Sequence, residues 1–249
     1  MRTLEPDSFN ACHFFQAETV KKKTHITREK NKLKASSLSR FRTDSWLSDA
    51  DANFLLRKRA QREASKKNYL TAIALFSRLT AYEPHNAENF ANRGLMHYNL
   101  RQYPQALKDY NRAIELDPEL GRAYSNRANL HASQRNWTDA IADYDQAIDL
   151  NPLNIRARLN QSITFREMRD YEAALDCLDI ALFFRPNSPA LHAERGRTYQ
   201  LKGEWNKAMS DYATARNLIQ ATAPAELNNS KPNELARINS RVLRWMHNL

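Results

Sequence analysis

The sequence predicts an all-α protein made of stacked helix pairs, and three observations lead to this fold class. Prolines recur at a constant interval of 34 residues, at Pro84, Pro118, Pro152 and Pro186. Small and apolar residues recur at the same interval and, within each interval, at helical spacing. Glycine is scarce, with 4 among 249 residues, and alternating β-branched runs are rare. We therefore expect a helical repeat protein.

Residues 1–47 are expected to form a basic, disordered tail. Within them, the segment Lys21–Arg42 has nine Lys or Arg and one acid, and it has few apolar residues to bury. Such a tail can be merely solvated, or it can contact nucleic acid, ribosomes or an anionic membrane surface. The acids Glu5, Asp7, Glu18 and Glu29 argue against a third role, that of a transit peptide.

Five units of 34 residues follow if each proline is numbered position 32 of its unit. Near Trp46 the composition changes, and Ser48–Asp51 offers a capping start for the first helix. Position 20 is alanine in all five units, position 17 is always aromatic, and position 8 is always small. The units cover residues 53–86, 87–120, 121–154, 155–188 and 189–222.

Each unit is expected to fold as two antiparallel helices. Positions 4, 7, 8 and 11 mark one face of a first helix, and positions 17, 20, 24 and 27 mark one face of a second. Small residues at positions 8, 20 and 27 let the helix backbones approach closely, since larger ones would cost about 1–3 kcal/mol in overpacking. The proline ends the second helix because it lacks an N–H. One pair cannot bury its apolar face alone, so the pairs stack into a solenoid.

The recurring positions resemble the tetratricopeptide repeat family over residues 53–222, about two thirds of the chain. The family has small residues at positions 8, 20 and 27, an aromatic residue at position 24 and proline at position 32. The resemblance implies a right-handed superhelical solenoid that binds other proteins and performs no chemistry. Two departures stand out: a cation replaces the family's frequent glycine at position 15 in four units, and Gln220 replaces the last proline.

Residues 223–249 are expected to form a linker and a C-terminal capping helix. Ser230 can cap this helix, and Pro232 suits its first turn. We expect the helix to cover the exposed face of the fifth unit; the alternative is a helix that docks a second protein. Its apolar residues recur at helical spacing and are Leu235, Ile238, Val242, Trp245 and Leu249.

No enzymatic activity, cofactor or metal site is expected. The sequence has no glycine-rich phosphate loop, no HExxH motif and no Ser/His/Asp or Cys/His set at motif spacing. His97 and His131 share position 11 of adjacent units, about 8–10 Å apart, which is too far to share a metal. Cys12 and Cys177 form no CxxC pair, and no apolar stretch approaches the about 18 residues of a membrane span. We expect the cytoplasm or an organelle interior such as the stroma, with peripheral membrane association as an option.

In the resembled family, the first helices line a concave groove through positions 2, 5, 6, 9, 12 and 13. Position 6 carries Asn92, Asn126 and Asn160 in three successive units, and an amide both donates and accepts hydrogen bonds. This ladder can hold the backbone of an extended peptide; alternatively, asparagine is simply common there. Basic residues outnumber acidic ones, so we expect an acidic peptide segment as the ligand. The predicted groove residues are Arg57, Lys58, Asn92, Tyr98, Arg122, Asn126, Asn129, Arg156, Asn160, Arg166 and Arg197.

A carboxylate clamp, as in relatives that bind the tails of heat-shock chaperones, is disfavoured. Among the residues at the clamp positions of the first three units, only Asn92 is identical to its counterpart. Where the clamp needs lysine, Arg57 and Arg122 would bind a carboxylate with a different geometry.

The four cations at position 15 define a basic edge, formed by Lys67, Arg101, Arg135 and Arg169. Because they follow one another by one unit each, they should line one edge of the solenoid. Such a row can follow an acidic partner or a phosphate backbone. Alternatively, it is a solvated turn that keeps the protein soluble.

These features predict a protein–protein interaction scaffold or assembly factor, with a co-chaperone-like mode of binding. The alternative is a nucleic-acid- or ribosome-associated protein that uses the basic tail and the basic edge, and whose affinity falls steeply with salt. A third option is a passive subunit of a larger complex. The fold class by itself does not choose among the three, nor does it give the oligomeric state.

Overall fold

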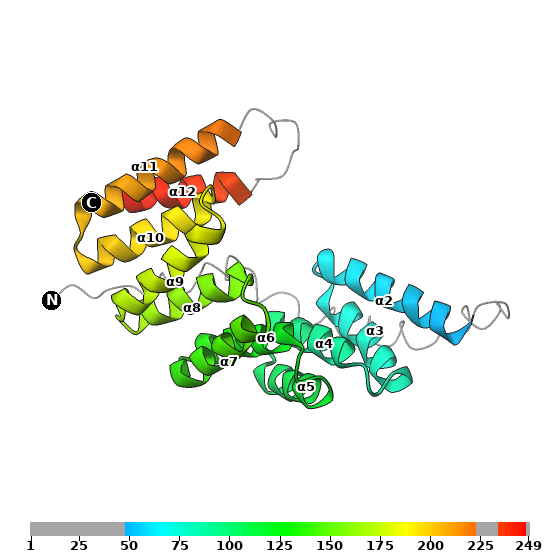
Figure 1. Cartoon of the computed structure of the whole chain (residues 1–249). Coiled ribbons are helices and arrows are strands. Elements are labelled where there is room, and N and C mark those ends of the chain that lie inside the picture. Colours follow the sequence, from blue (N-terminus) through cyan, green and yellow to red (C-terminus); the bar gives the residue numbers. More distant parts are fainter. Residues whose placement is uncertain (1–47, 223–233, 248–249) are drawn as a thin grey trace, which may run out of the picture.

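The computed structural model describes residues 48–222 and 234–247, and the regular secondary structure in both ranges is α-helical. The expected disordered tail lies outside these ranges, as do residues 223–233 of the expected linker. The eleven helices of the described ranges are labelled in Figure 1. They are α2 Asp49–Ser65, α3 Tyr69–Tyr82, α4 Ala87–Asn99, α5 Tyr103–Leu116, α6 Gly121–Ser133, α7 Trp137–Leu150, α8 Ile155–Glu167, α9 Tyr171–Phe184, α10 Pro189–Lys202, α11 Trp205–Thr222 and α12 Glu234–His247.

Consecutive helices form pairs, and the pairs stack in chain order into the predicted solenoid (Figure 1). Helix α2 packs against α3, and the same holds for α4 with α5, α6 with α7, α8 with α9 and α10 with α11. Each second helix also contacts the first helix of the next unit. From α4 to α10, the first helices of neighbouring units contact one another. All eleven predicted groove residues lie on the five first helices, and the surface that these residues form is called the groove below.

A left-handed residue joins the two helices of each unit. In unit 2, the N–H of Arg101 bonds to the carbonyl of Tyr98 at 2.9 Å, and the N–H of Gln102 bonds to that of His97 at 2.9 Å. This arrangement is the Schellman motif, which needs a positive φ at Arg101, and φ is 59° there. The same two hydrogen bonds recur in the other four units, so the chain leaves every first helix at the same turn.

Proline ends the second helices, as predicted. Helices α3, α5, α7 and α9 each stop two residues before the proline, and the intervening residue leaves the helical region of φ and ψ. In unit 5, Gln220 keeps the N–H that proline lacks, so α11 continues for 18 residues, whereas these four helices have 14.

The core repeats with the sequence. The position-20 alanines are fully buried, and the position-24 side chains, among them Tyr110 and Tyr212, are at most 1% exposed. In units 2 and 5, glycine stands where the ring meets the first helix, whereas units 1 and 3 have alanine there. A Cβ on Gly94 would lie 2.8 Å from Cε1 of Tyr110, and a Cβ on Gly196 would lie 2.8 Å from Cδ1 of Tyr212. Close packing of the position-24 side chain against the backbone of the first helix therefore limits position 8 to a small residue.

Helix α12 covers the last unit, which confirms the capping helix expected from the sequence. Ile238 and Val242 are buried in one cluster with Tyr212 and Ala215 of α11, and Trp245 packs against that cluster. Figure 1 shows α12, in red, alongside α10 and α11. The expected cap, first-turn proline and last apolar residue of this helix lie outside the described residues.

Candidate peptide groove and basic edge

Two amides of the predicted ladder have no hydrogen-bond partner among the described residues. Asn92 on α4 and Asn126 on α6 occupy the same unit position, and both side chains are half-buried. Neither amide forms a hydrogen bond with another residue that the structure describes. Each retains its donors and its acceptor for a peptide backbone.

The third amide of the ladder is already bound within the protein. Asn160 on α8 donates to Oδ1 of Asn129 on α6 at 2.8 Å. The same oxygen accepts a hydrogen bond from the buried hydroxyl of Tyr144 at 2.7 Å. Asn129 and Asn160 therefore join α6, α7 and α8, and the open part of the ladder shortens to the two amides of units 2 and 3.

The equivalent junction one unit earlier lacks this network. Leu95 stands at the unit position of Asn129 and offers no acceptor to Asn126 or to the ring of unit 2. The hydroxyl of Tyr110 is buried without a hydrogen-bond partner among residues 48–222 and 234–247, and this burial raises the pKa of Tyr110. A leucine in place of an asparagine thus leaves Asn126 open.

Carboxylates of the protein hold two of the predicted groove arginines. Arg57 on α2 forms an ion pair with Glu83 and donates to Oδ1 of Asn89 at 3.3 Å. Arg166 on α8 is buried and forms an ion pair with the buried Glu194 of α10 at 2.8 Å. Both arginines already have counter-charges, so they offer less to an acidic ligand than their number suggests.

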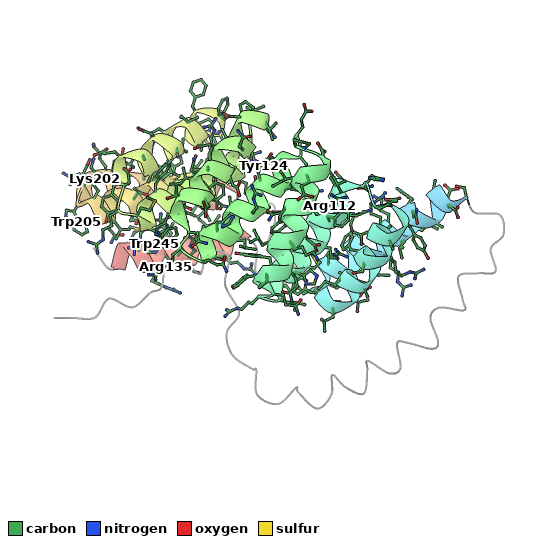
Figure 2. The ribbon with its side chains drawn as sticks, turned by 90° about the horizontal axis from the view of Figure 1, so that it is seen from below. Arg112, Tyr124, Arg135, Lys202, Trp205 and Trp245 are labelled. Carbon is green, nitrogen blue, oxygen red and sulfur yellow. The ribbon has the colours of Figure 1, made fainter. Side chains whose placement is uncertain are left out.

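Helix α12 closes the groove at unit 5. Arg241 of α12 pairs with Glu194 in addition to Arg166. Burial by itself would raise the pKa of Glu194, but the two guanidinium groups outweigh burial and lower it. Arg197 donates to Oε1 of Gln200 at 3.1 Å, and its guanidinium lies 5.7 Å from the ring centroid of Trp245, which Figure 2 labels on α12.

Three predicted groove cations remain exposed, in units 1, 3 and 4. Lys58 lies over the ring of Phe54 at 5.4 Å. Arg122 is 3.5 Å from Glu88, and both side chains are about half exposed, so this pair is weak. Arg156 has no ion pair within the described residues. The exposed charge of this part of the groove is therefore positive.

The predicted groove tyrosine forms an aromatic contact near the turn of unit 2. Tyr98 of α4 is half-buried, and its ring centroid is 6.0 Å from that of Tyr103 at an interplanar angle of 49°. Tyr98 also packs, together with Tyr103, against the buried cluster of Ala106, Tyr110 and Leu130.

The basic edge consists of residues in a left-handed backbone conformation. The φ values are 63° at Lys67, 59° at Arg101, 63° at Arg135 and 66° at Arg169, and Gly203 makes the same turn in unit 5 at 92°. A non-glycine residue in this region costs about 1–2 kcal/mol. All four cations are exposed, and Figure 2 shows Arg135 at the margin of the molecule.

Aromatic rings alternate with these cations. The residue two positions after each basic-edge cation begins the second helix and is aromatic. The four rings are half-buried, so each combines a packed face with an accessible part. They are Tyr69, Tyr103, Trp137 and Tyr171.

Sequence reasoning missed a set of arginines that join neighbouring units. Arg127, at position 7, donates to both carboxylate oxygens of Asp143 at 2.8 and 2.7 Å and to Oδ1 of Asn111 in the preceding unit at 2.7 Å. Units 2 and 5 have the same arrangement, centred on Arg93 and Arg195. The signal was present as an Arg and an Asp 16 residues apart in three of the five units.

The described residues hold no group of three or more potential metal ligands. His97 accepts or donates one hydrogen bond with Gln102 at 2.7 Å and lies 3.9 Å from Asp109. Burial raises the pKa of the Cys177 thiol to about 11, so at neutral pH it is protonated and poorly nucleophilic. Within the described ranges, no helix has the length and apolar character needed to cross a bilayer.

Two segments of the chain, residues 87–120 and 121–154, match the tetratricopeptide repeat family. Solved structures of similar fold include MamA from residue 41 onwards of Desulfovibrio magneticus RS-1, with a TM-score of 0.62 and 16% identity; the match covers 70% of this chain and 98% of that chain. A crystal structure of MamA protein has a TM-score of 0.60 and 17% identity, covering 73% and 100% of the two chains. At such identities the similarity shows a common fold. No curated protein gives a significant match to the sequence.

Proposed function

We propose that this tetratricopeptide repeat protein is a protein–protein interaction scaffold that binds an extended, acidic segment of a partner in the groove of units 1 to 4. The observation that carries the proposal is the pair of open amides, Asn92 and Asn126. Nearby groove polar groups in units 1, 3, 4 and 5 have partners within the protein, whereas these two have none among the described residues. Two amides one unit apart suit the main chain of an extended peptide.

Charge supports an acidic ligand. Lys58, Arg122 and Arg156 are exposed at groove positions of units 1, 3 and 4, and among the described residues only Arg122 has an ion-pair partner, Glu88. Carboxylates of a partner would find charge-assisted hydrogen bonds here. Arg57 and Arg166 already form ion pairs within the protein, and Arg197 contacts Trp245 of α12. We therefore assign these three arginines a supporting role in binding.

The proposal assigns binding to this protein and no catalysis. The predicted groove residues are amides, cations and Tyr98, and none of them is a nucleophile paired with a base. Identification of the partner therefore has to come from capture.

A capture experiment tests the proposal. The full-length protein and an Asn92→Ala/Asn126→Ala variant are immobilised, and partners from a lysate of the source organism are identified by mass spectrometry. Asn206→Ala/Asn217→Ala, which removes two exposed amides from α11, is the matched control. We expect one or more proteins to bind the wild type and the control but not the groove variant. If the same proteins bind all three in equal amounts, the groove is not the site.

A further inference from the structure

We propose that the basic edge is a second binding surface, separate from the groove, and that it takes single-stranded nucleic acid. Arg101, Arg135 and Arg169 are exposed, and none of their guanidinium groups forms a hydrogen bond or ion pair with another residue that the structure describes. Lys67 continues the row into unit 1. Guanidinium groups without counter-charges are well suited to phosphate, which they can bind through two parallel hydrogen bonds.

The fold requires a left-handed residue at this turn but does not require a cation. Gly203 makes the turn in unit 5 with the same pair of backbone hydrogen bonds that is found at Arg101, Arg135 and Arg169. Glycine adopts this conformation without steric cost, whereas arginine does not. The unfavourable backbone conformation recurs at this solvent-exposed position in four successive units. This recurrence indicates that the four side chains serve a purpose other than folding.

The alternation of cations with aromatic rings distinguishes nucleic acid from an acidic protein. Tyr103 follows Arg101, and Trp137 follows Arg135, each at the start of a second helix and each with part of its ring accessible. Proteins that bind single strands combine cations for the backbone with rings on which bases stack. An acidic protein segment would satisfy the cations and leave the rings without a counterpart.

The row has the dimensions of a short strand, and its charge is strongest in units 1 to 3. Neighbouring units are separated by about 10 Å, so four cations extend over about 30 Å. Lys66 adds a further exposed cation in unit 1, although its Nζ lies 3.6 Å from Oε1 of Glu63. In unit 4, Asp170 and Glu172 follow Arg169, although Glu172 is paired with Lys202 at 2.8 Å. We therefore place the strand along the first three units, with its end at the fourth.

The test uses the full-length protein and a variant whose turns remain unstrained. In Arg101→Gly/Arg135→Gly/Arg169→Gly, glycine accepts the left-handed conformation and three positive charges are lost. The control, Lys108→Gln/Arg185→Gln/Arg216→Gln, loses the same charge from exposed positions outside these turns. Binding of a fluorescent 20-nucleotide oligouridine is measured by anisotropy between 50 and 300 mM salt. All proteins retain residues 1–47, so any contribution of that basic segment is common to them.

The salt dependence decides the outcome. Three phosphate contacts contribute about 2 to the slope of log affinity against log salt on a single strand. We expect the glycine variant to lose about 2 from this slope and at least tenfold in affinity at 50 mM salt, while the control keeps a slope close to that of the wild type. Equal slopes for the glycine variant and the control would overturn the proposal.

A polyglutamate chain of equal charge tests the alternative ligand. It is expected to bind the wild type more weakly than oligouridine, and with little difference between the wild type and the glycine variant. If polyglutamate binds the wild type as tightly as oligouridine does, and the glycine variant loses as much affinity for polyglutamate as for oligouridine, the edge recognises acidic protein. The nucleic-acid assignment is then wrong. Capture of partners through Asn92 and Asn126 is a separate measurement. The proposal for the groove and the proposal for the basic edge can therefore be overturned independently.

Discussion

Arg127 and Asp143 form a bidentate ion pair, with Nε–Oδ2 and Nη2–Oδ1 distances of 2.8 and 2.7 Å. The pair connects the two helices of unit 3, α6 and α7. The third nitrogen of Arg127 donates to Asn111 of unit 2 at 2.7 Å, so one side chain also holds two units together. Hydrogen bonding to Asp143 raises the pKa of Arg127 and so favours its charged form.

Removal of this arginine should weaken the junction between units 2 and 3. We expect Arg127→Ala to lower the free energy of unfolding by about 2–3 kcal/mol, because Asp143 is then left buried without its counter-charge. Urea denaturation followed by circular dichroism measures the loss. Arg112→Ala is the control, since Arg112 pairs with Glu115 in an exposed setting, and about 0.5 kcal/mol or less is expected there. Equal losses would show that burial of the pair does not matter.

The close contact of Gly94 with Tyr110 predicts a steric defect. In Gly94→Ala, the new Cβ would lie 2.8 and 2.9 Å from two ring carbons, and we expect a loss of about 1–3 kcal/mol. Unit 4 has the combination of Ser162 with Leu178 at the same two positions. Adding Tyr110→Leu should therefore recover part of the loss. Gly121→Ala is the control, because its Cβ would meet nothing closer than 3.4 Å. A stable Gly94→Ala variant would contradict this account.

The left-handed turns predict opposite effects of glycine and alanine. Gly203→Ala should cost about 1 kcal/mol, since φ is 92° and alanine disfavours that region. Arg135→Gly removes the corresponding cost but raises the conformational entropy of the unfolded chain. We therefore expect the free energy of unfolding to rise by between zero and about 1 kcal/mol. Thermal unfolding of both variants gives the comparison. If Arg135→Gly lost as much stability as Gly203→Ala, the arginine would have a folding role at this turn.

Buried carboxylates predict a loss of stability in acid. The pKa of Glu194 is lowered from its ordinary 4.5 by Arg166 and Arg241, despite opposing burial. Below about pH 5 the unfolded chain therefore takes up protons that the folded protein does not. The contribution of Glu194 is complete above the ordinary pKa and is lost as pH falls through the lowered one. Unfolding free energy should decrease steadily below pH 5, and Glu194→Gln should show a shallower decrease. Parallel curves would refute the assignment.

The groove was predicted in part from the sequence. The positions of the eleven candidate residues followed from the unit numbering, and each of them lies on a first helix. Which of them are open did not follow, because that depends on partners such as Asn129 for Asn160, 31 residues away, and Arg241 for Glu194, 47 residues away. The roles of Asn92 and Asn126 in peptide binding stay predictions.

The sequence alone determined the helical pairs, their stacking and the capping helix. These features depend on signals that act within a few residues, such as Pro118 at a helix end, or that repeat every 34 residues, such as the buried alanines. Tertiary structure decided which polar side chains hold the units together and which face a ligand. Arg127 and Arg156 are the same residue type, each on the first helix of its unit, yet one is tied to a carboxylate and the other is exposed. The difference arises because a charged side chain is satisfied only by groups that folding brings within hydrogen-bond distance.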